Sequence, residues 1–192
     1  MYFDIVTNKT DLIPMNSNGR YLFKQENLNR PYRVYVTDEK KIKKVFGQIN
    51  KKIYKHNISK LLCLDYHGVT DLYNLDEPIP SSTPKIVISY IGGNPKTIGS
   101  TTNAIIKRIK SKEVLFGIIV YLKEPEPICG TKGWILSHLS SSNPGLKLHF
   151  IDDGKLNIQC VNKLVNPNII TYFHDSKNPN SKSNLTQLLE KI

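Results

Sequence analysis

The chain has 192 residues and contains few cysteines. Cys63, Cys129 and Cys160 are odd in number and far apart, so their spacing indicates neither a zinc knuckle nor a disulfide framework. Cys63 falls inside an apolar run, and we expect it to be buried and reduced. The cysteines therefore indicate neither a redox function nor a structural zinc site.

Long hydrophobic runs are also missing. No apolar stretch approaches the roughly 20 residues that cross a bilayer, and the first residues lack the charged start and apolar core of a signal peptide. We therefore expect a cytoplasmic protein without membrane contact. Lysine, asparagine and isoleucine are abundant, which is compatible with the AT-rich genome of a large DNA virus; the location would then be the host-cell cytoplasm.

Arginine is scarce, with four residues among 27 cations, yet the net charge is +11. The excess is uneven: residues 1–60 hold 13 basic and five acidic residues, for a net +8, while the remainder holds a net +3. Such a basic segment suggests an acidic partner, such as nucleic acid. The alternative is that codon use alone enriched the chain in lysine, and both explanations stay open at this point.

Residues 1–58 are interpreted as a small basic extension packed on the main domain. The alternating run 32–36 predicts a strand. A helix is predicted from Asp38 to Tyr54, because apolar residues recur on one face at helical spacing. Its other positions carry Lys40, Lys41, Lys43, Lys44, Lys51 and Lys52, with Lys55 just beyond. This lysine face is either the solvated side of a surface helix or a surface that contacts phosphates.

From residue 59 onward, strand and helix patterns alternate. Strands are predicted at 60–64, 85–90, 113–122, 146–151 and 168–173, and helices at 100–110, 131–140, 157–164 and 184–192. Alternation of this kind predicts an α/β fold with a mainly parallel, Rossmann-like sheet flanked by helices. Residues 59–192 are accordingly expected to form one domain.

Polar side chains mark the ends of these elements. Asp65 directly follows the first apolar strand, Ser89 follows the run 85–88, and Asp152-Asp153 follow the strand before Gly154. Lys132 opens a predicted helix. Ligands of open α/β sheets bind beyond the carboxyl ends of the strands. An acid, a hydroxyl, an amine and a pair of acids gathered there would suit a metal ion and a phosphate.

Taken in this order, the residues resemble the four motifs of the haloacid dehalogenase-like (HAD) hydrolase superfamily. The first motif is Asp65-Tyr66-His67-Gly68-Val69-Thr70, and the others are Ile88-Ser89, Thr131-Lys132-Gly133 and Phe150-Ile151-Asp152-Asp153. The resemblance covers residues 59–175. Phosphoacceptor receiver domains use a similar set of groups, but their paired acids come first in the chain, whereas here they come last.

The resemblance implies a HAD-like fold and a role for each residue. Asp65 would attack phosphorus and form an aspartyl-phosphate. Mg²⁺ would be held by Asp65, the backbone carbonyl of His67 and Asp152, with support from Asp153. Ser89 would donate a hydrogen bond to a phosphoryl oxygen, and Lys132 would neutralise charge on the nucleophile and the phosphoryl group.

The sequence departs from the family pattern at His67, where family phosphatases carry a second aspartate that protonates the leaving group. Either the imidazole performs this acid–base work, or the site is weakened and the chain is a nucleic-acid-binding or protein-interaction module on a HAD-like scaffold. Asp65 and Ser89 are 24 positions apart, and Ser89 and Lys132 are 43 apart. Neither gap holds a full cap domain. The resemblance thus implies an open site for a macromolecular or polyanionic phosphate substrate.

Overall fold

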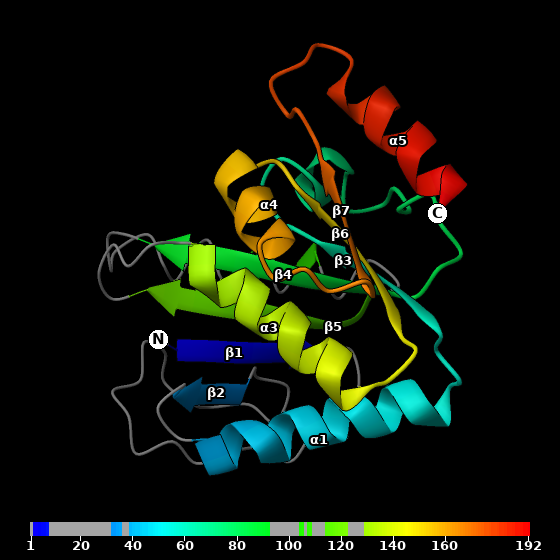
Figure 1. Ribbon diagram of the computed structural model, residues 1–192. Coiled ribbons are helices and arrows are strands. Elements are labelled where there is room, and N and C mark those ends of the chain that lie inside the picture. Colours follow the sequence, from blue (N-terminus) through cyan, green and yellow to red (C-terminus); the bar gives the residue numbers. More distant parts are fainter. Residues whose placement is uncertain are drawn as a thin grey trace.

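The structure is a computed structural model that describes residues 2–7, 32–35, 39–92, 104–105, 107–108, 114–122 and 129–192 (Figure 1). Its strands are β1 (Tyr2–Thr7), β2 (Tyr32–Tyr35), β3 (Lys60–Leu64), β4 (Lys85–Gly92), β5 (Val114–Leu122), β6 (Lys147–Asp152) and β7 (Ile169–Phe173). Its helices are α1 (Glu39–Lys55), the 3₁₀ turn η1 (Thr70–Leu72), α3 (Cys129–Ser142), α4 (Lys155–Asn162) and α5 (Ser181–Lys191). None of the helices in these ranges is both long and apolar enough to span a membrane.

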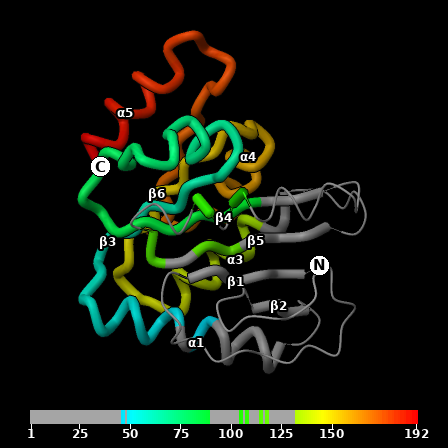
Figure 2. The backbone as a smooth tube through the Cα atoms, turned by 180° about the vertical axis from the view of Figure 1, so that it is seen from behind, coloured from blue at the N-terminus to red at the C-terminus, as the bar shows by residue number. Residues whose placement is uncertain are grey.

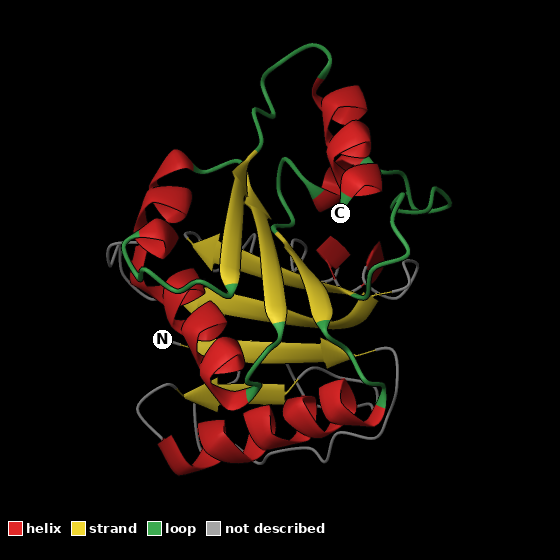
Figure 3. Ribbon diagram, turned by 45° about the vertical axis from the view of Figure 1, so that its right-hand side comes forward, coloured by secondary structure: helices red, strands yellow, loops and turns green. Residues whose placement is uncertain are grey.

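All seven strands belong to one sheet, in the order β2-β1-β5-β4-β3-β6-β7 (Figure 3). The five strands from β5 to β7 are mutually parallel, whereas β1 pairs antiparallel with both β5 and β2. The predicted α/β, mainly parallel Rossmann-like fold is thereby confirmed. Strands β1 and β2 come from the basic N-terminal segment and extend the same sheet at its β5 edge.

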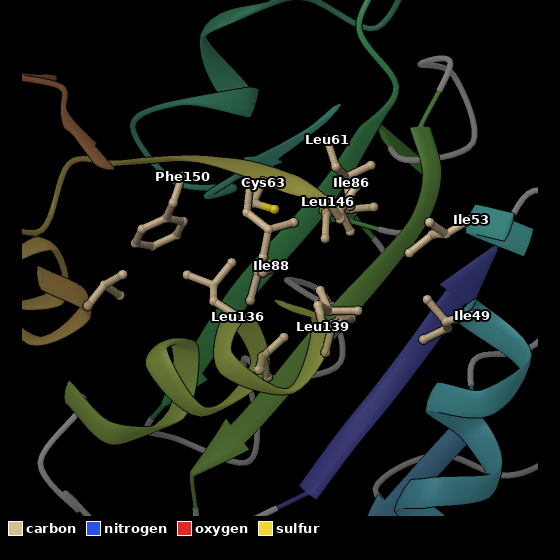
Figure 4. Packing of buried hydrophobic residues seen from close by; sticks show 14 of the residues in the cluster. Ile49, Ile53, Leu61, Cys63, Ile86, Ile88, Leu136, Leu139, Leu146 and Phe150 are labelled. Atoms are coloured by element: carbon tan, nitrogen blue, oxygen red, sulfur yellow. The ribbon is translucent and has the colours of Figure 1, made fainter. Parts of the chain in front are cut away.

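Helices cover both faces of the sheet. On one face, α1, α3 and α4 contribute apolar side chains to a core that also contains Leu61, Cys63 and Phe150 (Figure 4). On the other face, Leu185 and Leu189 of α5 pack with Leu62, Leu64 and the segment around η1; Figure 2 shows this side. Since alternate residues of β3 point into opposite cores, the strand is apolar throughout after Lys60, as expected for a doubly covered strand.

The strand order has a reversal that matters for function. From β3 the chain adds β4 and then β5 on one side, and afterwards places β6 and β7 on the other side of β3. In open parallel sheets, the crevice at such a reversal is where ligands bind, beyond the carboxyl ends of the two strands. Here these strands are β3 and β6, which end beside Asp65 and at Asp152.

Most predicted elements lie within two residues of those observed, with three differences. Strand β4 runs two residues past its predicted end to Gly92, so that Ser89 lies well inside the strand and not near its end. Helix α5 begins at Ser181, three residues before its predicted start. The predicted helix 100–110 falls largely outside the described residues, which are helical at 104–105 and 107–108.

The cysteines give a mixed result. Cys63 is free and completely buried in the core, as predicted, and burial raises the pKa of its thiol. Cys160 of α4, by contrast, is disulfide-bonded. Spacing along the chain could not indicate this bond, because a disulfide depends on how α4 is placed against the rest of the fold.

Candidate active site

Two aspartates and one lysine meet at the crevice between β3 and β6. Lys132, in the first turn of α3, places its Nζ 2.9 Å from Oδ1 of Asp65 and 2.6 Å from Oδ2 of Asp152. All three residues are buried, with exposed fractions of 2% for Lys132, 6% for Asp65 and 0% for Asp152. The predicted convergence of these groups, which are up to 87 positions apart in the chain, is present in the structure.

Asp153 completes an acidic cluster with Asp65 and Asp152. One carboxylate oxygen from each of the three lies within 4.8 Å of the other two. Oxygen ligands at this spacing suit a hard divalent cation such as Mg²⁺. Three carboxylates and one ammonium leave a formal charge of −2 in the cluster, which one divalent cation would neutralise. The three carboxylates therefore fit the Mg²⁺ ion that the resemblance implies.

The pKa values of Asp65 and Lys132 are both raised, as expected in a site with more negative than positive charge. The pKa of Asp65 is raised to about 6: burial raises it most, the ammonium of Lys132 lowers it, and the neighbouring carboxylate of Asp152 raises it. Burial lowers the pKa of Lys132, but the carboxylates of Asp65 and Asp152 more than offset this, so its pKa is raised. One lysine is thus shared between two buried carboxylates and does not fully compensate them.

Backbone and side-chain donors orient the carboxylates. The N–H of Tyr66 donates to Oδ1 of Asp65 at 2.7 Å, and the N–H of Gly154 donates to Oδ1 of Asp152 at 2.7 Å. The amide of Asn157, near the start of α4, donates to both oxygens of Asp152 at 3.0 and 3.2 Å. The Ser176 hydroxyl donates to Oδ2 of Asp153 at 2.7 Å. These bonds fix the cluster before any ligand arrives.

Asn157 and Ser176 were not predicted as site residues. Asn157 is buried beside the core residues Ile158 and Val161 of α4. A polar side chain at a core-facing position of a helix is the signal that could have identified it. Ser176 follows β7 in a loop, and its proximity to Asp153 depends on the path of that loop, for which the sequence holds no comparable signal.

Ser89 lies beside the site in the strand register, but no hydrogen bond joins it to the described site residues. The last β3–β4 pair joins Leu64 with Val87, so Ser89 lies two residues further along β4, level with the loop that follows Asp65. Its side chain is completely buried, and its hydroxyl has no hydrogen-bond partner in the described part of the chain. A buried hydroxyl without a partner is costly, and a ligand oxygen would satisfy it.

His67 lies in the loop that follows Asp65, directly before Gly68. Its side chain is exposed, and its ring lies edge-to-face against Tyr66, with ring centroids 5.0 Å apart. Burial raises the pKa of nearby Asp71, while the His67 imidazole lowers it in part. Among the described contacts, none joins the imidazole to Asp65, Asp152 or Asp153. The acid–base and metal-binding roles of His67 remain predictions.

Gly68 links the loop after β3 to Asp153. It has φ of +67°, and a Cβ at this position would lie 2.2 Å from Oδ2 of Asp153 and 2.8 Å from Cβ of Ser176. Both the backbone conformation and the close approach therefore require glycine. The glycine of the first motif thus lets the loop after Asp65 pass close to Asp153.

We expect Gly68→Ala to destabilise the protein by about 2–4 kcal/mol, because backbone strain adds to the displacement of Asp153. Gly145→Ala is the matched control: Gly145 has φ of +86°, but a Cβ there meets nothing within 4 Å. It should cost only the strain, about 1–2 kcal/mol. Urea unfolding of both variants measures the difference. Equal losses would show that Asp153 does not depend on Gly68.

Comparison of the chain with protein-family models, with curated proteins and with solved structures gave no match in any of the three. The function must therefore be argued from the geometry of the site.

Proposed function

We propose that this protein is a Mg²⁺-dependent, HAD-like phosphohydrolase that acts through an aspartyl-phosphate on Asp65. The observation that carries the proposal is the buried bridge from Lys132 to both Asp65 and Asp152 at the reversal of strand order, with Asp153 beside them. The order of these residues in the chain is that of the HAD motifs, and their arrangement agrees with the roles that the resemblance implies.

The contacts of Asp65 suit a nucleophile. Both described contacts of its carboxylate, from Tyr66 N–H and from Lys132, are to Oδ1. They hold the group in one orientation and leave Oδ2 to attack phosphorus. Lys132 would also offset charge that develops on the phosphoryl oxygens, and the Ser89 hydroxyl would donate to one of them. A bound Mg²⁺, held by Asp65, Asp152 and the backbone carbonyl of His67 with support from Asp153, would neutralise the remaining charge.

The reaction takes two displacements. Oδ2 of Asp65 forms a bond to phosphorus as the bond to the leaving oxygen breaks, and that oxygen takes a proton from the imidazolium of His67. Water then gives a proton to the neutral imidazole and attacks the phosphorus of the aspartyl-phosphate. Inorganic phosphate leaves and the Asp65 carboxylate is restored. His67 lies in the loop next to Asp65 and is exposed, so it would have to turn toward the bound substrate.

An open site suits a macromolecular or polyanionic phosphate, since no cap domain fits in the gaps between the motifs. The net charge of +11 favours nucleic acid as that substrate. The exposure of His67 and its lack of a described contact with the acidic cluster favour a second candidate: a catalytically weakened HAD-like scaffold that binds nucleic acid or another protein without turnover.

Turnover of a phosphorylated oligonucleotide and of a small aryl phosphate separates the two functions. With Mg²⁺ we expect slow hydrolysis, and with EDTA none. His67→Asp should raise the rate by about 10-fold or more, because a carboxyl group then occupies the acid–base position of the family pattern. His67→Ala is the control and should lower the rate. If the wild type and His67→Asp both fail to hydrolyse either substrate, the hydrolase proposal is wrong and the scaffold function is favoured.

A further inference from the structure

A groove of about 760 Å³ lies far from the acidic cluster, between α1 and the turn that joins α3 to β6. Figure 1 shows the carboxyl-terminal ends of α1 and α3 on the same side of the molecule. Ser59 and Leu146, which line the groove, directly precede β3 and β6. The groove is therefore at the amino ends of the strands whose carboxyl ends carry the acidic cluster, roughly 20 Å away at about 3.3 Å per residue.

Two glycines keep this groove open. Gly47 of α1 and Gly145 of the α3–β6 turn both line it, and a Cβ at either would meet nothing within 4 Å. Glycine inside a helix costs about 1 kcal/mol relative to alanine. Gly47 thus lowers the intrinsic stability of α1, and the absence of a side chain at this position leaves room in the groove.

The lining combines an apolar floor with an exposed aromatic ring and positive charge. Ile53 and Leu146 are buried core residues at its base. Tyr54 is 84% exposed and lies at the rim. Lys51 lines the groove three residues before Tyr54. Lys55 is not part of the lining, but it is exposed four residues after Lys51, on the same side of the helix. Among the described residues that line the groove, none is acidic.

We propose that this groove binds single-stranded nucleic acid, with one base stacked on Tyr54 and the neighbouring phosphates near Lys51 and Lys55. Stacking platforms flanked by lysines are how proteins hold single strands without reading their sequence. The carboxamides of Asn50 and Asn57 also line the groove. Oδ1 of Asn50 already accepts from Nδ2 of Asn143 at 2.8 Å, which leaves the amino group of Asn50 and the carboxamide of Asn57 to hydrogen-bond to base edges. An acidic peptide would use the lysines, but it would leave the exposed ring without a stacking partner.

This inference extends the proposed function, because a polymer held at the groove could reach the acidic cluster at the opposite end of β3 and β6, whereas a mononucleotide could not. The binding itself does not depend on hydrolysis. Binding is therefore measured in EDTA, where no hydrolysis is expected. A loss of binding then tests the groove alone, and a loss of turnover with Mg²⁺ tests the hydrolase proposal.

The test is fluorescence anisotropy with a labelled 12-nucleotide oligothymidylate at low salt. Tyr54→Ala should weaken binding about 5- to 100-fold, in line with the loss of one stacked base, whereas Tyr54→Phe should bind as the wild type does. Gly47→Leu should weaken it comparably, because it fills the groove with a side chain that favours helix. Circular dichroism melting checks that each variant is folded.

Charge is tested with two double variants. Lys51→Ala/Lys55→Ala should reduce both the affinity and its dependence on salt. Lys163→Ala/Lys177→Ala is the control, because it removes the same charge from exposed positions elsewhere.

The proposal is overturned if the wild type does not bind, if Tyr54→Ala and Gly47→Leu bind as the wild type does, or if both double variants lose the same amount of affinity. Tighter binding of an oligoglutamate, or a dimer that Gly47→Leu dissociates, would assign the groove to an acidic peptide or to a second copy.

Discussion

Replacement of Lys132 by methionine should lower the free energy of unfolding by about 3–5 kcal/mol at neutral pH without metal. Removing one partner of a buried ion pair leaves uncompensated charge in a site from which water is excluded. Here Asp65 and Asp152, at 2.9 and 2.6 Å from Nζ, would both lose their cation. Methionine fills a similar volume, so the loss reports charge more than packing. Urea unfolding in EDTA measures it.

Lys182→Met is the matched control. Lys182 of α5 lies 2.6 Å from Oε2 of Glu77, as close as Lys132 is to Asp152, but its side chain is 44% exposed. A surface pair of this kind contributes about 0–1 kcal/mol. The two substitutions thus separate burial from distance. Mg²⁺ should recover part of the stability lost in Lys132→Met, since the cation replaces the missing positive charge. Equal losses in the two variants would contradict the electrostatic description of the site.

Replacement of Asp65 by asparagine should abolish turnover and stabilise the metal-free protein. Loss of the attacking carboxylate removes the covalent route, which should lower the rate by on the order of 10³-fold or more. Asparagine retains an oxygen that can accept from Tyr66 N–H and from Lys132, but it carries no charge. We therefore expect the free energy of unfolding to rise by about 1–3 kcal/mol at pH 7.5 in EDTA.

The raised pKa of Asp65 explains why Asp65→Asn should be more stable than the wild type and at which pH the difference should appear. The pKa of Asp65 is about 6 in the folded protein, above the ordinary value of 3.8. The folded state therefore holds the proton more tightly, and the wild type loses stability as pH rises from about 4 to about 6. The difference between Asp65→Asn and the wild type should grow over this window and vanish below it. Asp65→Asn that is less stable than the wild type at pH 7.5, or that still turns over substrate, would contradict the prediction.

The main part of the site could be predicted because its residues stand at positions that a parallel sheet brings together. Asp65 follows β3 and Asp152 ends β6, and adjacent parallel strands place their carboxyl ends side by side. Lys132 could be placed because the helix before β6 has to start near the same edge. Chain order and element type were sufficient for this convergence.

The rest depends on loops and on strand lengths. Ser89 was expected at the end of its strand, but β4 pairs with the long strand β5 as far as Gly92. The contact between Gly68 and Asp153 requires a positive φ and a particular path of the loop after β3, neither of which periodicity reveals. Strand β1 joins the β5 edge antiparallel, and the local pattern of residues 2–7 contains no information about which edge it would join.

Diffraction from crystals soaked with Mn²⁺ and beryllium fluoride would test most directly whether this edge of the sheet is a phosphoryl-transfer centre. Mn²⁺ takes the same oxygen ligands as Mg²⁺ and is located by its anomalous signal. We predict one anomalous peak between Asp65 and Asp152, and a beryllium fluoride group attached to a carboxylate oxygen of Asp65 with one fluorine near Lys132. An empty cluster at saturating Mn²⁺, with Lys132 still bridging the two aspartates, would contradict the proposed chemistry.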